Sequence, residues 1–426
     1  MQRAALALYS PLAIAVLVAL WVERGLSHWE YSDGVYAYTA RAVLGGVDLY
    51  REIVAAQPPP LFHAGAAMLA VGDDVATLRA GLAAVAFAGG ALAAVAVWRL
   101  TRRVVTAALG GLAALVTPWA LHEHAVLTPE AFAGPLLLGA ALAASRPRWA
   151  WAGGALAALA AAFKLSYLLP LGALALVAAR RGTYVATAAV TTGLLWGAFF
   201  ALHGRAVIDD VVVAQGQAGI HPVRDLAGLV AQGAWNVAPL AGLCALALVL
   251  RGRSADPALA RTLTALLVGA LALFATLVKD GSYLNFLTVV ELPAVVLAVA
   301  GLRWAFADWA RGVGSGAGVG IGALACVALV AAQSVALLVS PDRPLVFVRP
   351  LSAPAHGRLL SDTQVRDAVA GARGCPDGVA YSGEPYLAFV ARRPMPGGQP
   401  DQFIVSEAAV HAARRRAVAA VQPRCP

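Results

Sequence analysis

The chain has 426 residues, of which 60% are hydrophobic and 13% are charged, and its formal net charge is +9. Soluble globular proteins carry about 25% charged residues, so this composition excludes an ordinary soluble enzyme and indicates a protein of the lipid bilayer. The positive charge lies in short arginine clusters between apolar runs and not along one polar face, which excludes a nucleic-acid partner.

The first apolar run, residues 4–22, follows Arg3 and has no convincing small-residue cleavage site. We therefore interpret it as a retained span and not as a signal peptide. Arginine clusters then alternate with further apolar runs, and positive charge accumulates in cytoplasmic loops. If every cluster is cytoplasmic, the chain crosses the membrane out and back between successive clusters, with its N-terminus inside and its C-terminus outside. The clusters lie at residues 99–103, 146–148, 180–181, 251–261 and 303–311.

These rules predict a mainly α-helical, polytopic transmembrane bundle of about eleven spans. The spans are expected at residues 4–22, 76–98, 104–121, 131–144, 150–163, 165–180, 184–202, 237–250, 262–278, 286–302 and 317–340. The apolar stretch 58–72 has only about fifteen residues, and a span there would move the cluster at 99–103 outside, so we expect it to be re-entrant or interfacial. The outer face then carries residues 23–75, 122–130, 164, 203–236 and 279–285.

The composition changes after Pro341 to a segment that carries Pro, Arg and Asp. We therefore predict that residues 1–340 form the transmembrane domain and residues 341–426 a small extracytoplasmic α/β domain. Helices are expected there at 363–372 and 407–418, and strands at 378–380 and 386–391. In an oxidising compartment Cys375 and Cys425 would form a disulfide, and otherwise they remain two thiols.

The first outer loop, residues 23–75, carries the most informative pattern. Asp33 follows the first span, and a helix, a Gly-Gly turn with Tyr50 and a proline-rich return after Gln57 come next. This order resembles the C-type glycosyltransferase superfamily, in particular the protein O-mannosyltransferases and the aminoarabinose transferase of lipid A. The resemblance implies that the acidic residue of the loop, here Asp33, is catalytic, and we expect Tyr36 and Tyr50 to contact the substrate.

A positioned carboxylate is also what the chemistry requires, because it deprotonates the acceptor hydroxyl as that hydroxyl attacks the sugar. The alternative role for Asp33 is to cap a helix that begins near Gly34. The sequence departs from the superfamily at two positions. Gly34 stands where a second acidic residue is common, and Gln57 stands where many members have lysine. The second departure removes a cation that would meet the donor phosphate.

The chain has two lysines, Lys164 and Lys279, and both are expected at outer ends of spans. An ammonium there binds a phosphate and stabilises the leaving group, although lysines at span ends also simply extend to the interface. Arg79 is the third candidate for the donor phosphate, with helix anchoring as its alternative role. Residues 279–285 resemble a Lys-x-Gly-Ser-x-x-Asn tip of bacterial members, so Ser282 and Asn285 either bond sugar or phosphate oxygens or form a tight turn.

The second outer loop supplies Glu123 and Glu130, where the superfamily often has a second carboxylate that shares a divalent metal with the first. Mg²⁺ or Mn²⁺ bridging Asp33 and one of these glutamates is therefore expected as a cofactor, and capping of the next helix is the alternative role of Glu130. The His-Glu-His sequence around Glu123 does not favour zinc, because neighbours on a helix do not face each other. Glu291 lies within an apolar run, where a charge is costly, and its partner is unknown from the sequence.

Together these features predict a glycosyltransferase of the bacterial cell envelope, an integral protein of the plasma membrane that is related to mannosyltransferases. It would move a hexose or pentose from a polyprenyl-phosphate donor to a glycan, lipid or protein acceptor on the outer face, with inversion. The alternatives are a transporter or lipid flippase, which would show inverted repeats that the sequence lacks, and a membrane scaffold. The sequence specifies neither the sugar nor the acceptor.

Overall fold

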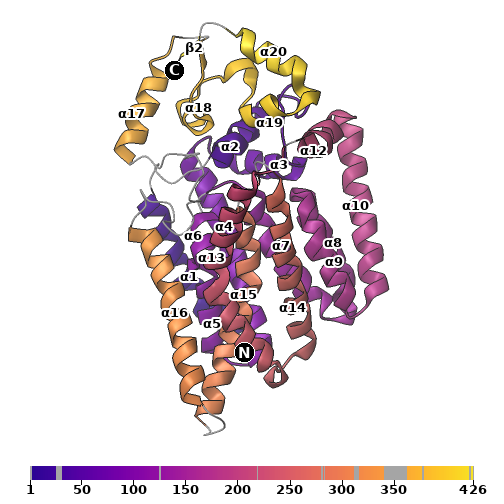
Figure 1. Cartoon of the computed structure of the whole chain (residues 1–426), viewed down its shortest axis with the longest axis vertical. Coiled ribbons are helices and arrows are strands. Elements are labelled where there is room, and N and C mark those ends of the chain that lie inside the picture. The colour runs from indigo at the N-terminus through magenta and orange to yellow at the C-terminus, as the bar shows by residue number, and fades with distance from the viewer. Residues whose placement is uncertain are drawn as a thin grey trace.

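The protein is a bundle of helices that run along its long axis, with shorter helices gathered at one end (Figure 1). The computed structural model describes the chain apart from residues 1, 25–30, 124–125, 218, 280–281, 283, 311–315, 340–361, 377–378, 422–423 and 426. The helices of the bundle are α1 (Gln2–Arg24), α4 (Val75–Thr101), α5 (Val104–Val116), α7 (Pro129–Ala144), α8 (Ala150–Phe163), α9 (Leu168–Val177), α10 (Arg181–His203), α13 (Val223–Val249), α14 (Pro257–Leu271), α15 (Leu287–Trp309) and α16 (Gly316–Val339).

The bundle has the length and composition of a membrane domain. Within the described residues, 6 helices are long and apolar enough to cross a bilayer: Gln2–Val22, Val75–Thr101, Arg181–His203, Val223–Val249, Pro257–Val278 and Leu284–Trp309. The chain is therefore an integral membrane protein. Every expected span falls on a helix, but several helices, such as α5 and α7, are shorter than a full crossing, so the count of about eleven stays a prediction.

The expected spans at 104–121 and 237–250 have the wrong bounds. The first is interrupted at Thr117, between α5 and α6. The span expected at 237–250 begins at Val223, because α13 continues for several turns beyond the apolar run. Gln232 and Asn236 on this extension are buried against protein, so these polar residues do not end the helix. Hydropathy marks the part of a helix that faces lipid, and it misses a polar part that faces the protein.

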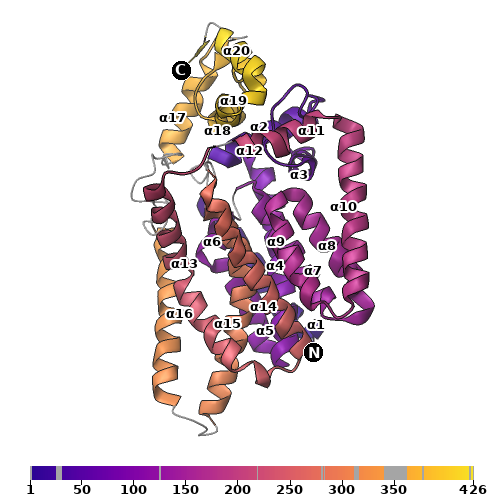
Figure 2. The same cartoon turned by 45° about the vertical axis from the view of Figure 1, so that its right-hand side comes forward.

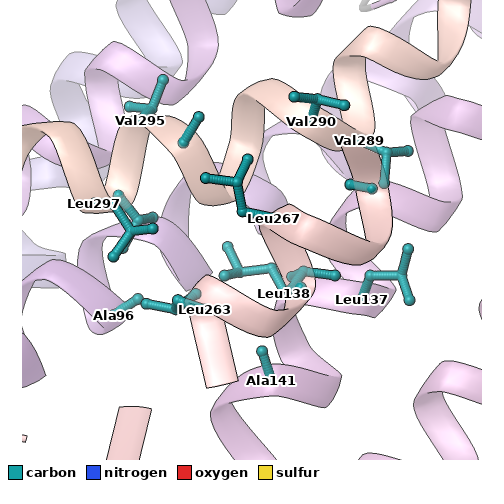
Figure 3. Close-up of a cluster of buried hydrophobic side chains, with 14 of the residues drawn as sticks. Ala96, Leu137, Leu138, Ala141, Leu263, Leu267, Val289, Val290, Val295 and Leu297 are labelled. Carbon is teal, nitrogen blue, oxygen red and sulfur yellow. The ribbon is translucent and has the colours of Figure 1, made fainter. Parts of the chain in front are cut away.

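The core of the bundle lies around α15. In its apolar window 83% of the residues are buried, against 11% for α10, so α15 is the central helix and α10 is exposed along most of its surface. Leucine and valine side chains of α15 interdigitate with those of α7 and α14 (Figure 3). A Cβ added to Gly301 of α15 would lie 2.8 Å from the Cα of Ala247 in α13, so glycine permits the close approach of these two backbones.

A charged cluster joins three helices at the end of the bundle opposite the short helices. The Arg99 guanidinium donates to Asp256 at 2.7 Å, and Arg146 donates to the same carboxylate at 2.9 Å. Asp256 also caps α14 by accepting from the Leu259 N–H. Three of the predicted arginine clusters therefore lie at one end of the bundle, as the alternation of sides requires. That this end is cytoplasmic stays a prediction.

The other end is built by α2 (Tyr31–Leu44), α3 (Pro59–Leu69), α6 (Pro118–Glu123), α11 (Ala206–Ile208) and α12 (Gln215–Gln217). The helix α3 lies beside α2 and has 11 residues, which corresponds to roughly 16 Å and is too short to span a bilayer. This agrees with the expectation that the stretch 58–72 does not cross (Figure 2).

The last described part of the chain lies over this end, and we call it the C-terminal cap (residues 362–376, 379–421 and 424–425). Its elements are α17 (Asp362–Arg373), β1 (Ala380–Tyr381), α18 (Pro385–Ala391), α19 (Gln402–Glu407), α20 (Ala412–Ala420) and β2 (Arg424–Cys425). The two strands pair in parallel over two residues each, so the described cap is far more helical than the expected α/β domain. The boundary expected at residue 340 lies outside the described residues.

Two expectations for the cap were wrong. Residues 386–391, expected as a strand, form α18, because Pro385 occupies the first helical position and short apolar runs do not distinguish strand from helix. The helix expected at 407–418 is two helices, since α19 ends at Glu407 and α20 begins at Ala412. The helix expected at 363–372 is confirmed as α17.

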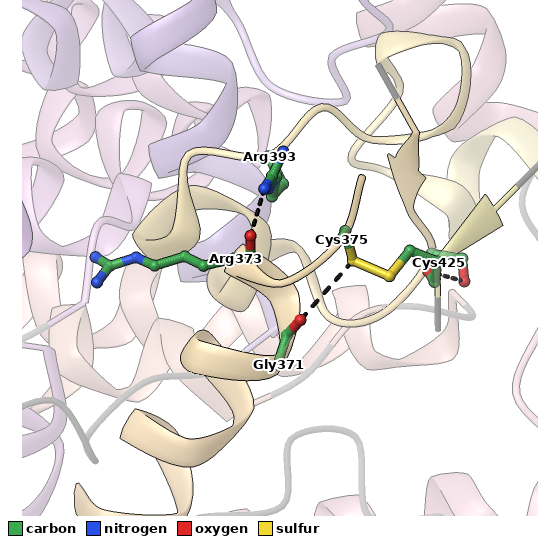
Figure 4. The surroundings of a disulfide bond; sticks show 6 residues. Gly371, Arg373, Cys375, Arg393 and Cys425 are labelled. Atoms are coloured by element: carbon green, nitrogen blue, oxygen red, sulfur yellow. Dashed lines mark hydrogen bonds between the residues drawn. A yellow bond between two sulfur atoms is a disulfide. The ribbon is translucent and has the colours of Figure 1, made fainter. Parts of the chain in front are cut away.

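A disulfide closes the cap. Cys375, just after α17, is bonded to Cys425 of β2, and their Cα atoms are 5.9 Å apart (Figure 4). Of the two readings that the sequence left open, the bridge is therefore the correct one. It ties the final strand to the helix that precedes β1.

Candidate active site

Asp33 lies at the end of the bundle that carries the short helices, in the first turn of α2. Its side chain is buried, with 3% of the residue exposed, and its Oδ1 atom accepts a hydrogen bond of 2.6 Å from the backbone N–H of Leu127. The helix begins at Tyr31, so the reading of Asp33 as the cap of a helix near Gly34 is wrong. The carboxylate instead connects α2 to the segment that leads into α7.

The same segment brings a second carboxylate and a lysine to the site. Glu130, in the first turn of α7, is fully buried, and its Oε1 atom is 2.7 Å from the Lys164 ammonium. The rings of Phe132 and Phe163 stack beside this pair with their centroids 4.9 Å apart. Asp33 and Lys164 therefore each contact the stretch from Leu127 to Glu130, and the catalytic and phosphate-binding roles of these residues stay predictions.

The two carboxylate oxygens of Glu130 differ in their contacts, because only Oε1 is paired with Lys164. Its Oε2 atom is buried and has no hydrogen-bond partner among the described residues. Glu130 also lies in the first turn of α7, where the helix dipole favours a negative charge. Its alternative role in capping α7 is therefore compatible with the ion pair to Lys164. Lys164 remains 29% exposed at its side chain, which leaves part of the ammonium accessible from outside.

The two tyrosines of the first loop meet at Gln57. The Gln57 amide donates to the Tyr36 hydroxyl at 3.2 Å, and the Tyr50 hydroxyl donates to the Gln57 carbonyl at 2.7 Å. Tyr50 has a φ of 70°, a left-handed conformation that is uncommon outside glycine, and it is 1% exposed. Gln57, which stands where lysine was expected, therefore contacts the hydroxyl groups of both tyrosines. Their contact with substrate stays a prediction.

Lys279 belongs to a neighbouring group. Its ammonium donates to the side chain of Gln215, whose own amide donates to the Ala56 carbonyl at 3.1 Å. Ala56 precedes Gln57, so Lys279 is connected to the first loop through α12. Asp280, which follows Lys279, lies outside the described residues.

Ser282 and Asn285 are the other predicted site residues of the segment 279–285. The Ser282 N–H donates to the Lys279 carbonyl at 3.1 Å, and the Ser282 carbonyl lies 3.2 Å from Nε2 of His221. Asn285 is half-buried in the short helix Leu284–Phe286. The alternative reading of this motif as a turn is therefore correct for the backbone of Ser282, while sugar binding by the side chains stays a prediction.

Arg79 and Glu123 complete the predicted set. Arg79 lies in the second turn of α4 and is 4% exposed, so it does not anchor the helix from the interface. The side chain of Glu123 lies outside the described residues. Within the described residues, no group of three or more His, Cys, Asp or Glu side chains has the arrangement of a metal site.

The C-terminal cap packs directly on the helix that carries Asp33. A Cβ at Gly34 would lie 2.3 Å from the backbone nitrogen of Tyr386 in α18, so only glycine fits there. The Arg41 guanidinium lies 3.8 Å above the ring of Phe389, and its Nε atom forms an ion pair of 2.5 Å with Asp73. The cap therefore leaves no room for a side chain at position 34.

Polar contacts fix the cap on the loop between α2 and α3. The Gln399 side chain accepts from the Val54 N–H at 2.7 Å and donates to the Glu52 carbonyl at 2.7 Å. Arg414 donates to the carbonyls of Glu52 at 2.9 Å and of Tyr50 at 2.7 Å. Through these bonds Gln399 and Arg414 satisfy backbone groups of the loop and hold Tyr50 in its left-handed conformation.

A buried acidic residue lies under the cap. Asp210, in the π-helix Asp209–Ala214, accepts from the Ala55 N–H at 3.0 Å, and its other oxygen is 3.5 Å from Nε2 of His411. Burial raises the pKa of Asp210 to about 7, although the Ala55 hydrogen bond and Arg414 act against this shift. Burial and the nearby Arg414 lower the pKa of His411.

Sequence reasoning missed the residues of the cap that complete the site. Tyr386, Gln399 and Arg414 contact the first loop across more than 300 positions of the chain, and ordinary residue types at such distances give no local signal. Glycine at position 34 was the one available sign, because glycine beside a functional residue often marks a close approach of backbone.

The fold of these helices is similar to that of a solved membrane glycosyltransferase of the C type, so the resemblance expected from the first outer loop is confirmed at the level of the fold. The solved structures that show it are of ArnT, an aminoarabinose transferase, from Cupriavidus metallidurans. The structure of ArnT bound to undecaprenyl phosphate has a TM-score of 0.61 and 16% identity, and the match covers 93% of this chain and 88% of that chain. The apo structure gives 0.60 and 16%, with 91% and 85% covered.

No protein-family model and no curated protein sequence matches the chain. At 16% identity the likeness to ArnT shows the fold and not the activity. The role of each site residue is therefore argued below from its own contacts.

We predict that Gly34→Ala displaces the cap, because the added methyl group overlaps the Tyr386 backbone. Overpacking of this kind costs about 1–3 kcal/mol. The measurement is limited proteolysis of the detergent-solubilised protein, in which the cap of the variant should be cleaved faster. Gly45→Ala is the control, since a Cβ there meets its nearest atom at 3.4 Å. Equal cleavage of the two variants would show that α18 does not rest on Gly34.

A second prediction concerns pH. Because the pKa of Asp210 is raised from 3.8 to about 7, its contribution to cap stability is complete below pH 3.8 and is lost as the pH rises through 7. His411 acts in the opposite sense, since its lowered pKa makes its contribution complete above 6.5 and lost on acidification. In Asp210→Asn, which keeps an acceptor for Ala55, the thermal midpoint of the cap should fall less between pH 4 and 7 than in the parent. An identical pH dependence in both proteins would remove Asp210 from this role.

Proposed function

We propose that the protein is a glycosyltransferase that takes a sugar from a polyprenyl-phosphate donor at the end of the bundle where Asp33 lies. The observation that supports the proposal is that Asp33 and Lys164 both contact the stretch from Leu127 to Glu130, Asp33 through the Leu127 N–H and Lys164 through the Glu130 carboxylate. The likeness to an ArnT structure bound to undecaprenyl phosphate supports a lipid-phosphate donor. The protein would act in the plasma membrane of a bacterium, with this end outside and the N-terminus in the cytoplasm.

Asp33 is the proposed general base. The Leu127 N–H holds Oδ1 in a fixed place, so the carboxylate is oriented before the acceptor arrives. It would take the proton of the acceptor hydroxyl while the hydroxyl oxygen bonds to the anomeric carbon and the bond from that carbon to the phosphate oxygen breaks. One displacement of this kind inverts the anomeric centre.

Lys164 is the proposed partner of the departing phosphate. Its ammonium has three donors, of which the contact with Glu130 uses one, and the side chain is partly exposed. As the glycosyl bond breaks, negative charge grows on the phosphate, and a fixed cation nearby stabilises it. Glu130 orients the ammonium, and this explains why a carboxylate is fully buried beside it.

The remaining residues would serve the two substrates. Lys279 and Arg79 supply further positive charge for the donor phosphate, and Lys279 is connected to the first loop through Gln215. Tyr36, Tyr50, Ser282 and Asn285 would contact the sugar. The sugar, whether hexose or pentose, and the acceptor, whether glycan, lipid or protein, are left open by this set of residues.

A divalent metal stays a separate prediction. Its ligands would be Asp33, Glu123 and Glu130, and the described part of the site fits it poorly. The Lys164 ammonium already neutralises Glu130, and a second cation beside it would be repelled. No step above therefore depends on a metal.

The central prediction is that Asp33→Asn lowers transfer by about 10²–10⁴-fold, because asparagine keeps the shape of the side chain but does not accept a proton. Transfer of labelled sugar from a polyprenyl-phosphate donor by purified protein is the measurement. Asp367→Asn on the exposed face of α17 is the matched control and should be neutral. The double variant Lys164→Met/Glu130→Gln, which leaves no buried charge unpaired, should retain the fold and lose binding of undecaprenyl phosphate. Full activity of Asp33→Asn would refute the proposed base.

We further predict that EDTA changes the rate of transfer by less than about twofold, because Lys164 supplies the positive charge beside Glu130. The rate is measured on the intact protein before and after chelation, and again after Mg²⁺ or Mn²⁺ is added back. Loss of transfer that either ion restores would contradict this expectation and establish the divalent cation instead.

A further inference from the structure

The end of the bundle that carries Asp256 has more basic than acidic side chains. In the described ranges, its acidic residues are Asp256 and Asp308, and both are already paired with arginines. Arg148, Arg180 and Arg181 are exposed at the same end, and no described acidic side chain forms an ion pair with them. This end therefore carries positive charge that the described part of the protein does not neutralise.

The three arginines come from two neighbouring turns at the end of the bundle away from the C-terminal cap (Figure 2). Arg148 lies in the turn between α7 and α8, and Arg180 and Arg181 lie where α10 begins after α9. The Ala179 N–H donates to the Ala144 carbonyl at 2.9 Å, so the two turns lie against each other. We call these three residues the arginine patch. Like charges held together repel one another, so a bound anion stabilises the patch.

Aromatic and apolar side chains are exposed beside the arginine patch. The rings of Trp149 and Trp151 lie 6.2 Å apart, and the two residues are 46% and 49% exposed. Tryptophan is enriched where a membrane meets water, so these rings indicate the height of the lipid headgroups. One turn nearer the middle of the bundle, Leu176 of α9 and Val185 of α10 are also exposed. The surface thus offers positive charge at headgroup height and apolar side chains below it.

This combination matches one class of lipid. Guanidinium groups bind phosphate oxygens through charge-assisted hydrogen bonds. In phosphatidylcholine the phosphate is followed by a quaternary ammonium, which the arginines repel, whereas phosphatidylglycerol has no such group. A soluble phosphate has no acyl chain to cover the exposed apolar side chains, so the surface favours a lipid over a free anion.

We propose that the arginine patch binds the headgroup of an anionic phospholipid, whose acyl chains lie against the exposed apolar side chains of α9 and α10. The site lies at the opposite end of the bundle from Asp33, so it goes beyond the proposed transfer reaction. Because the headgroup contacts both turns, the bound lipid also links the turn between α7 and α8 to the start of α10.

The experiment titrates the intact protein in detergent with phosphatidylglycerol or with phosphatidylcholine of the same chain length, and native mass spectrometry measures the bound lipid. The first phosphatidylglycerol should bind at least about tenfold more tightly than the first phosphatidylcholine, because three arginines face one negative charge. Raising ammonium acetate from about 0.1 M to about 1 M should reduce this preference, since it shortens the screening length. Glycerol phosphate, which has the headgroup charge without acyl chains, should not displace the lipid.

Variants locate the binding site. Replacing the whole patch with glutamine (Arg148→Gln/Arg180→Gln/Arg181→Gln) should reduce the preference to less than about twofold, while lysine at all three positions keeps the charge and should retain most of it. The matched control removes three exposed arginines from other turns at the same end and should keep the preference of the parent: Arg102→Gln/Arg103→Gln/Arg251→Gln. Elution profiles and thermal midpoints check that each variant is folded.

Three results would overturn the proposal. Equal binding of the two lipids by the parent protein would show that the patch does not select an anion. An equal loss of preference in the two glutamine variants would assign it to the charge of the whole end and not to the patch. Displacement by glycerol phosphate would leave a site for any phosphate. None of these measurements uses transfer activity, so the proposed function is tested separately.

Discussion

The structure depends on one constraint, which is that a polar group inside an apolar bundle must find its partner within the protein. The chain meets this constraint by pairing its charges at the two ends of the bundle. At one end Asp256 receives Arg99 and Arg146, and this cluster fixes α4, α7 and α14 relative to one another. At the other end Glu130 receives Lys164. The helix α7 contributes to both ends. The cluster of Asp256, Arg99 and Arg146 therefore also fixes how far along the bundle Glu130 lies.

The end of the bundle with Glu130 and Lys164 is completed by the C-terminal cap, which lies far away in the sequence. The C-terminal cap covers α2 and fixes the loop between α2 and α3 through Gln399 and Arg414. Burial under the cap raises the pKa of Asp210 and keeps Tyr50 from ionising, since the pKa of Tyr50 also lies well above its usual value. The cap therefore defines the surroundings of the site as well as its shape. Access of an acceptor to Asp33 has to be considered with the cap in place.

The sequence predicted what is local and missed what is distant. The helices of the bundle were recognised because each apolar run carries its own signal, and the cap helix α17 because its pattern is periodic. The strand expected at 386–391 was wrong, since these six residues are apolar without interruption, and such a run has no period that distinguishes a strand from a helix. The role of Gly34 failed for another reason. Its cause is the backbone of Tyr386, and nothing near Gly34 in the sequence contains that information.

Glu130 and Glu291 show how two buried glutamates of the same bundle come to serve different chemistry. Glu130 is neutralised by an ammonium, so its surroundings attract an anion, which is what a phosphate donor requires. Glu291 is held by the backbone N–H groups of Trp119 and Ala120 and by a hydroxyl, none of which carries a full charge. The difference comes from what each helix end faces, a lysine tip in one case and the start of α6 in the other.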